Sequence, residues 1–227
     1  MPSWNVHIAH ANRLLADAGA RSLGVSDVDA FLFGNVLPDV YVGYMVPHPT
    51  KILGYCRTHQ SYPGGIPLPN YKRYWRNFIA SYDFERRMGE VSDLMLGVWC
   101  HIVCDHTYNK YTRRYIHAHD IPVGEKTRIR KQTDFDLYGR SLTMGRLPRL
   151  TSELVQQGAA YPQYCVREVD ICAALEVIDE IAQTNLAAHE ESPHYSMLNK
   201  KFFSTAAAEA HWVMLRGLTG RHEIVTT

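Results

Sequence analysis

The stretch VSDLMLGVWCHIVCDHTYN, residues 91–109, predicts the most deeply buried helix of this chain. Its apolar residues fall on nearly every face of a helix, which is typical of an element inside a core. Segments with helical periodicity lie on both sides of it, and convincing strand-like alternation is missing from the sequence. We therefore expect an all-α fold, with residues 1–227 forming a single domain.

The remaining helices are predicted around this central one. Asn5 is a plausible N-cap for the first helix. The expected ranges are residues 6–18, 26–34, 71–82, 125–141, 170–189 and 197–217. Residues 35–70 are rich in Pro, Gly and Tyr, and we expect a long ordered loop region there. Loops of this length in a compact domain are usually functional.

Composition narrows the classes of function. The formal net charge is +1, so a generally basic surface and a stable nucleic-acid complex are not expected. No apolar run approaches the roughly 20 residues that a membrane-spanning helix needs. The N-terminal residues do not resemble a signal peptide, and a cytoplasmic location is the expectation. The sequence does not indicate an oligomeric state.

Histidine is the unusual residue of this chain. There are 12 histidines, and the first eight lie within residues 1–119. His101 and Asp105 are four residues apart on the predicted core helix, so they share one face. An ionised carboxylate in a core is costly unless it is paired or bound to a cation. Two interpretations are open at this point: a divalent metal site, and a His–Asp hydrogen bond that braces two helices.

Three other residues become candidate metal ligands when they are considered together with this pair. Asp39 follows Pro38 at the end of a hydrophobic segment, His59 lies in the loop region, and His7 opens the first helix. Each has a structural interpretation when taken singly. Asp39 would be a helix cap, His59 a surface histidine, and His7 a capping histidine.

The ordered set resembles the zinc-dependent phospholipase C family and, more distantly, the single-strand-specific zinc nucleases of the same fold. The resemblance covers about residues 4–140 and rests on motifs in the family's order. These are His7 in His7-Ile8-Ala9-His10-Ala11-Asn12-Arg13, Gly34-Asn35-Val36-Leu37-Pro38-Asp39, His59, and His101-Ile102-Val103-Cys104-Asp105.

The resemblance implies a metal centre and a reaction. One zinc ion would be held by Asp39, His59, His101 and Asp105, and a second by His7 with Asp105 shared. Other divalent metals could take the same place. Asp39 would also act in catalysis. The implied function is hydrolysis of a phosphoester, whether lipid or nucleotide, by zinc-activated water.

The chain also departs from the family. Trp4 is internal, so its amine cannot serve as the ligand that the N-terminal Trp of secreted members supplies. The positions of another zinc site hold Asn109, Arg128 and Gln132, and arginine cannot ligate a metal. That metal is expected to be absent, or rebuilt from a different set. The candidates for rebuilding it are His106, His117, His119 and Asp134.

Positive charge near the expected site suggests a contact with substrate. Arg128 and Arg130 would form a phosphate clamp that faces the metal cavity. The alternative is a solvated helix face. Two other functions stay open: a metal-stabilised binding or scaffold protein that has lost catalysis, and an HD-type phosphohydrolase. The second would use the adjacent pair His119-Asp120, which lies outside a good helix.

Overall fold

The computed structural model describes residues 2–81 and 90–222 of the chain. All regular structure in these residues is helical, which confirms the all-α prediction. The helices are α1 (Trp4–Ala18), α2 (Val28–Gly34), α3 (Leu37–Val40), α4 (Tyr55–Thr58), α5 (Tyr71–Tyr74), η1 (Trp75–Ala80), α7 (Asp93–Ala118), α8 (Glu125–Arg140), α9 (Ser152–Ala159), α10 (Glu168–Ala187), α11 (Lys200–Thr219) and η2 (Gly220–His222). No helix among them is both long and apolar enough to cross a membrane.

Several boundaries differ from the predicted ones. The central helix α7 continues to Ala118 instead of ending near residue 109, and the short helix α9 was not predicted. Ser3, and not Asn5, precedes the first turn of α1. The predicted loop region, residues 35–70, contains the single-turn helices α3 and α4. The helix predicted for residues 71–82 continues from α5 into the π-helical turns of η1, and residue 82 lies outside the described residues.

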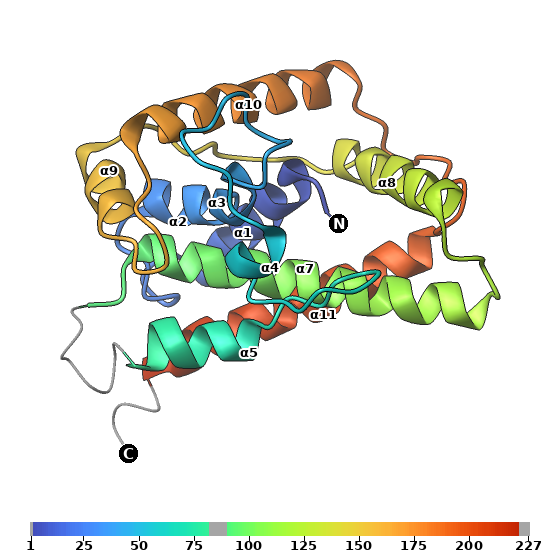
Figure 1. Cartoon of the computed structure of the whole chain (residues 1–227), viewed down its shortest axis with the longest axis horizontal. Helices are drawn as coiled ribbons and strands as arrows, with labels where there is room; N and C mark the ends of the chain where they lie inside the picture. Colours follow the sequence, from blue (N-terminus) through green and yellow to red (C-terminus); the bar gives the residue numbers. More distant parts are fainter. Residues whose placement is uncertain (1, 82–89, 223–227) are drawn as a thin grey trace.

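Helix α7 occupies the middle of the molecule (Figure 1). It packs most extensively against α2 and α11. In Figure 1, α10 and α8 lie above α7, and α11 runs alongside it. Every residue of α7 from Leu94 to Asp105 is buried, as its continuous apolar pattern predicts.

Two glycines bring α2 and α7 into backbone contact. A Cβ atom added to Gly97 would lie 2.1 Å from the carbonyl oxygen of Phe31 and 2.8 Å from the Cα of Gly34. A Cβ added to Gly34 would lie 2.4 Å from the carbonyl oxygen of Leu94. Only glycine permits this approach. The contact therefore places the chain that follows α2 beside the next turn of α7.

Asp170 fixes the segment between α3 and α4 against α10. Its buried carboxylate accepts hydrogen bonds from the Tyr41 hydroxyl at 2.8 Å and from the Thr50 backbone N–H at 2.8 Å. The Thr50 hydroxyl donates a third hydrogen bond at 2.5 Å. The segment is thereby held at Tyr41 and Thr50, and Tyr44 and Met45 between them line a cavity.

Candidate metal centre

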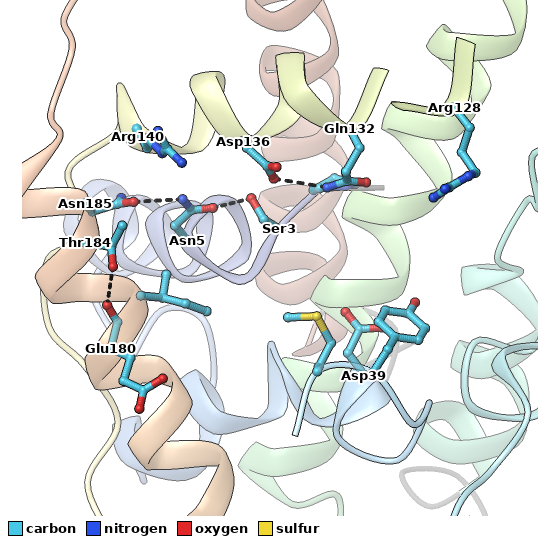
Figure 2. Close-up of a pocket in the computed structure, with 14 residues that line it drawn as sticks. Ser3, Asn5, Asp39, Arg128, Gln132, Asp136, Arg140, Glu180, Thr184 and Asn185 are labelled. Atoms are coloured by element: carbon cyan, nitrogen blue, oxygen red, sulfur yellow. Dashed lines mark hydrogen bonds between the residues drawn. The ribbon is translucent and has the colours of Figure 1, made fainter. Parts of the chain in front are cut away.

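A cavity of about 550 Å³ opens among the start of α1, the segment after α3, and the facing sides of α8 and α10 (Figure 2). One wall is a polar stripe on α8, made of residues four apart that share one helix face: Arg128, Gln132, Asp136 and Arg140. Asp39 also lines this cavity. Because Asp39 is one of the predicted metal ligands, the cavity leads to the predicted site.

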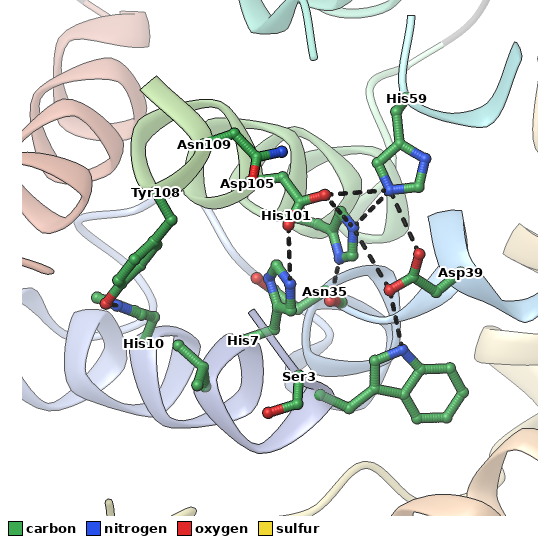
Figure 3. A network of polar contacts seen from close by, with 12 residues as sticks. Ser3, His7, His10, Asn35, Asp39, His59, His101, Asp105, Tyr108 and Asn109 are labelled. Carbon is green, nitrogen blue, oxygen red and sulfur yellow. Dashed lines mark hydrogen bonds and ion pairs between the residues drawn. The ribbon is translucent and has the colours of Figure 1, made fainter. Parts of the chain in front are cut away.

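The structure brings the five predicted metal ligands together in two overlapping groups, Asp39 with His59 and His101, and His7 with His101 and Asp105 (Figure 3). Helix α1 contributes one, α3 one, the residue after α4 one, and α7 two. All five residues are buried, with exposed fractions of at most 5%, and they are His7, Asp39, His59, His101 and Asp105. Burial of five such groups in one place is costly unless they satisfy one another or a shared cation.

The distances between neighbouring ligand atoms, 3.0–3.9 Å, bracket those around a small metal ion. His59 Nε2 lies 3.0 Å from His101 Nε2, 3.4 Å from Asp39 Oδ1 and 3.5 Å from Asp105 Oδ2. His101 Nε2 lies 3.9 Å from an oxygen of each carboxylate. Ligands about 2.0–2.2 Å from zinc in a tetrahedron lie about 3.3–3.6 Å apart. The ligand atoms of Asp39, His59 and His101 all lie within 4.8 Å of one another, so these three side chains could hold such an ion, with Asp105 Oδ2 beside His59.

Hydrogen bonds at the far side of each imidazole determine which nitrogen faces the cluster. His101 Nδ1 lies 2.8 Å from the carbonyl oxygen of Asn35, which only accepts, so Nδ1 carries the proton. Thr58 donates its hydroxyl proton to the Tyr55 carbonyl, so its oxygen accepts from His59 Nδ1 at 2.8 Å. His59 Nε2 and His101 Nε2 therefore face each other across 3.0 Å. The two nitrogens share a proton there, or a bound cation takes its place between them.

The charges of the cluster also favour a bound cation. Burial lowers the pKa of His101 to about 3, so this imidazole is neutral at pH 7. Burial works to raise the pKa of both carboxyl groups, but the adjacent histidines outweigh it and lower both values. Asp39 and Asp105 are therefore ionised where the histidines donate protons to them, and a divalent cation would replace those protons. Two buried negative charges beside neutral imidazole are the ligand set that a divalent cation neutralises.

His7 lies at the edge of this arrangement. Its Nε2 is 3.5 Å from Asp105 Oδ1, longer than a hydrogen bond, and its ring stacks on His101 with centroids 3.9 Å apart. Neither ring nitrogen of His7 has a hydrogen-bond partner among the described residues. His7, His101 and Asp105 nevertheless have ligand atoms within 4.8 Å of one another. This subset could hold a second ion.

Two aromatic residues that sequence reasoning did not assign to the site support the carboxylates. Tyr55 donates a hydrogen bond from its hydroxyl to Asp105 Oδ2 at 2.8 Å, and its ring stacks on His59 at 3.7 Å. Trp4 donates from its indole nitrogen to Asp39 Oδ2 at 3.2 Å. The spacing of Tyr55 and His59, four residues apart, was a usable signal for the first contact. The resemblance pointed to Trp4 only as a residue whose amine cannot ligate a metal, and it did not predict the contact of its indole with Asp39.

The two predicted substrate-binding arginines lie in different places. Arg128 lines the cavity, and its guanidinium is 63% exposed and paired with Glu125 at 2.5 Å. Arg130 donates a hydrogen bond to the carbonyl of Ser196 and is not among the residues that line this cavity. The geometry therefore keeps only Arg128 as a candidate for contact with a phosphoryl group.

The candidates for a rebuilt zinc site are not brought together. Asp134 accepts backbone hydrogen bonds from residues 196–198 at 2.6–2.8 Å, so its buried carboxylate anchors the start of α11. His106 donates through Nδ1 to the carbonyl oxygen of Pro69 at 2.7 Å. His117 and His119 are exposed near the end of α7. Asp120, the partner of His119 in the HD-type hypothesis, is exposed as well.

Comparison with family models, curated proteins and solved structures finds no significant match to this chain. The resemblance to the zinc-dependent phospholipases C is therefore carried by the motifs and their order alone.

Proposed function

We propose that this protein is a metal-dependent phosphoester hydrolase, with zinc as its ion and a site like that of the zinc-dependent phospholipases C. The observation that carries the proposal is the convergence of two imidazole Nε2 atoms and two carboxylates inside the protein. Structural His–Asp pairs do not need this arrangement, because in them one group donates a proton to the other. Here the hydrogen bonds to Asn35 and Thr58 turn the Nε2 atoms of both imidazoles inward.

The cavity supplies the access that catalysis needs. A bound divalent ion would polarise a phosphoryl oxygen and lower the pKa of a coordinated water. Asp39 belongs to both the ligand cluster and the cavity wall. Its Oδ2 is held by Trp4, while Oδ1 has no hydrogen-bond partner among the described residues. We assign Asp39 as a ligand and as the carboxylate that orients the attacking water and accepts its proton.

Arg128 is the proposed contact for the phosphoryl group. Its ion pair with Glu125 is exposed, and exposed pairs contribute little stability. Exchange of Glu125 for a substrate phosphoryl group is therefore inexpensive. The planar guanidinium would bind two phosphoryl oxygens at once and stabilise charge that develops during transfer.

Metal content is the first test. Protein reconstituted with zinc and freed of excess ion should contain at least one zinc per chain by elemental analysis. The His101→Ala variant should lose this zinc and melt at a lower temperature, because ligand removal leaves Asp105 buried without its cation. His117→Ala is a matched control on the same helix, since His117 is exposed and outside the cluster. Less than about half a zinc per chain in the wild type would refute the metal centre.

Hydrolysis is the second test. Zinc-loaded protein should hydrolyse bis(4-nitrophenyl) phosphate, and Arg128→Gln should lower the rate about 10- to 100-fold with zinc content unchanged. Comparing a nucleotide phosphodiester with a dispersed phospholipid would then identify the class of substrate. A wild type that holds zinc but cleaves none of these compounds would favour the metal-stabilised scaffold.

A further inference from the structure

We infer that the end of the cavity between α8 and α10 binds a polyhydroxyl group, so that the substrate is a phosphoester of a sugar or a cyclitol. This inference rests on the proposed function, because the phosphoryl group of such a substrate would lie near Asp39 and Arg128. It goes further by assigning the class of the group that the phosphoryl carries. Polar side chains that neither the metal centre nor the phosphoryl contact uses lead to this assignment.

The distal subsite, as we call this end of the cavity, is formed by side chains of two facing helices (Figure 2). Roughly three turns, or about 18 Å, separate Arg140 from Arg128 along the axis of α8. In Figure 2 the distal subsite lies on the left, whereas Arg128 and Asp39 lie on the right. A group bound there and a phosphoryl group at Arg128 would therefore be two parts of one extended ligand. The side chains of the distal subsite are Asp136, Arg140, Glu180 and Thr184.

These side chains have hydrogen-bonding capacity that the folded chain leaves unused. Asp136 accepts one hydrogen bond through Oδ1, from the side-chain amide of Gln132 at 3.1 Å. Arg140 is half-buried and forms no hydrogen bond or ion pair with the described residues. The exposed carboxylate of Glu180 likewise has no such partner in the part of the chain that the structure describes. Thr184 donates its hydroxyl proton to the backbone carbonyl of Glu180 at 2.9 Å, so its oxygen can still accept.

The mixture of charges in the distal subsite determines which class of ligand fits. A second anionic group would be attracted by Arg140 but repelled by Asp136 and Glu180. A cationic group would be attracted by the two carboxylates but repelled by the guanidinium. A hydroxyl group donates to a carboxylate and also accepts from a guanidinium, and both side chains can bind two neighbouring hydroxyls at once. A neutral group with several hydroxyls therefore satisfies the whole set.

Apolar groups and nucleobases fit the distal subsite less well. Burial raises the pKa of Asp136, because the carboxylate has lost part of its water. An apolar ligand would remove more water without replacing its hydrogen bonds, whereas hydroxyl groups would replace them. A nucleobase commonly stacks on an aromatic side chain. Among the described residues that line the cavity, only Tyr44 is aromatic, and it belongs to the segment after α3.

The first experiment compares two synthetic phosphodiesters that share a 4-nitrophenyl leaving group. One carries glucose through its 6-hydroxyl, and the other carries cyclohexylmethanol, which keeps a six-membered ring without the hydroxyls. Zinc-loaded wild type should hydrolyse the glucose ester with a kcat/KM at least about 10-fold higher, because the analogue leaves polar groups of the site unpaired. The preference should appear mainly in KM, since the hydroxyl contacts are the same before and during the reaction.

Two substitutions in the distal subsite test the assignment, and a third serves as the control. Arg140→Leu should bring the ratio of the two kcat/KM values to within about 2-fold of unity. Asp136→Asn retains the shape of the side chain and should also lower the ratio. Arg21→Leu is the matched control and should keep the wild-type ratio, because Arg21 is an exposed arginine that does not line the cavity. Equal kcat/KM values in the wild type, or a preference that survives in both subsite variants, would overturn the inference while leaving the hydrolase in place.

A binding measurement decides the case in which neither ester is cleaved. Saturation-transfer difference NMR of the zinc-treated protein should detect methyl α-glucopyranoside or myo-inositol but not cyclohexylmethanol, and Arg140→Leu should abolish the signal. Binding of this kind without hydrolysis would support the polyhydroxyl site and overturn the proposed hydrolysis. Absence of both binding and hydrolysis would overturn both proposals.

Discussion

Replacing Gly97 by alanine tests the backbone contact that connects the fold to the candidate metal centre. The new Cβ would lie 2.1 Å from the Phe31 carbonyl oxygen, whereas ordinary contact begins at 3.4 Å. Helices α2 and α7 would have to separate by roughly 1 Å. Overpacking of this kind costs about 1–3 kcal/mol, and the better helix propensity of alanine offsets about 0.5–1 kcal/mol. We expect a net loss of about 1–2 kcal/mol in the free energy of unfolding.

The same separation of α2 and α7 should also displace the metal ligand His101 from its hydrogen-bond partner. The Asn35 carbonyl, just after α2, accepts from His101 Nδ1 at 2.8 Å, one turn along α7 from Gly97. A shift of roughly 1 Å breaks this hydrogen bond, and zinc affinity should fall about 10-fold or more.

Urea unfolding with saturating zinc and a separate zinc titration measure the two effects. With a slope of about 2–3 kcal/mol/M, the midpoint should fall by about 0.5 M. Gly220→Ala is the control, because a Cβ there meets nothing within 4 Å and its φ is −77°. An unchanged midpoint for Gly97→Ala would refute the backbone contact. A lower midpoint with unchanged zinc affinity would refute its connection to His101.

Three further predictions concern single side chains. Tyr55→Phe keeps the ring that stacks on His59 but removes the hydrogen bond to Asp105, so zinc affinity by calorimetry should fall about 10-fold with unchanged helix content by circular dichroism. Asp134→Asn places an amide among three backbone donors and should cost about 1–3 kcal/mol in urea unfolding; a loss below about 0.5 kcal/mol would contradict the anchoring role. Burial lowers the pKa of His10 from 6.5 to about 3. Between these two pH values the unfolded chain therefore binds a proton at His10 that the folded chain does not bind. Stability should therefore fall as pH decreases from 6.5 toward 3, and a slope as steep in His10→Phe as in the wild type would exclude His10 as the cause.

The sequence alone determined the central helix and the identity of its polar pair. Apolar residues on nearly every face of α7 predict a core helix, and a spacing of four places His101 and Asp105 on one side. These are local properties that depend only on helical geometry. The order of Asp39, His59 and His7 along the chain indicated the same site, which the structure assembles.

Tertiary packing decided the details on which the chemistry depends. Sequence did not distinguish Arg128 from Arg130, because α8 carries charged residues around most of its surface and gives no clear apolar stripe. Packing of α8 turns Arg128 to the cavity and Arg130 to the carbonyl of Ser196. The orientation of the imidazoles likewise depends on a backbone carbonyl, that of Asn35, 66 residues from His101. Such contacts follow from how closely two helices approach, which the Gly34–Gly97 crossing permits and no local pattern encodes.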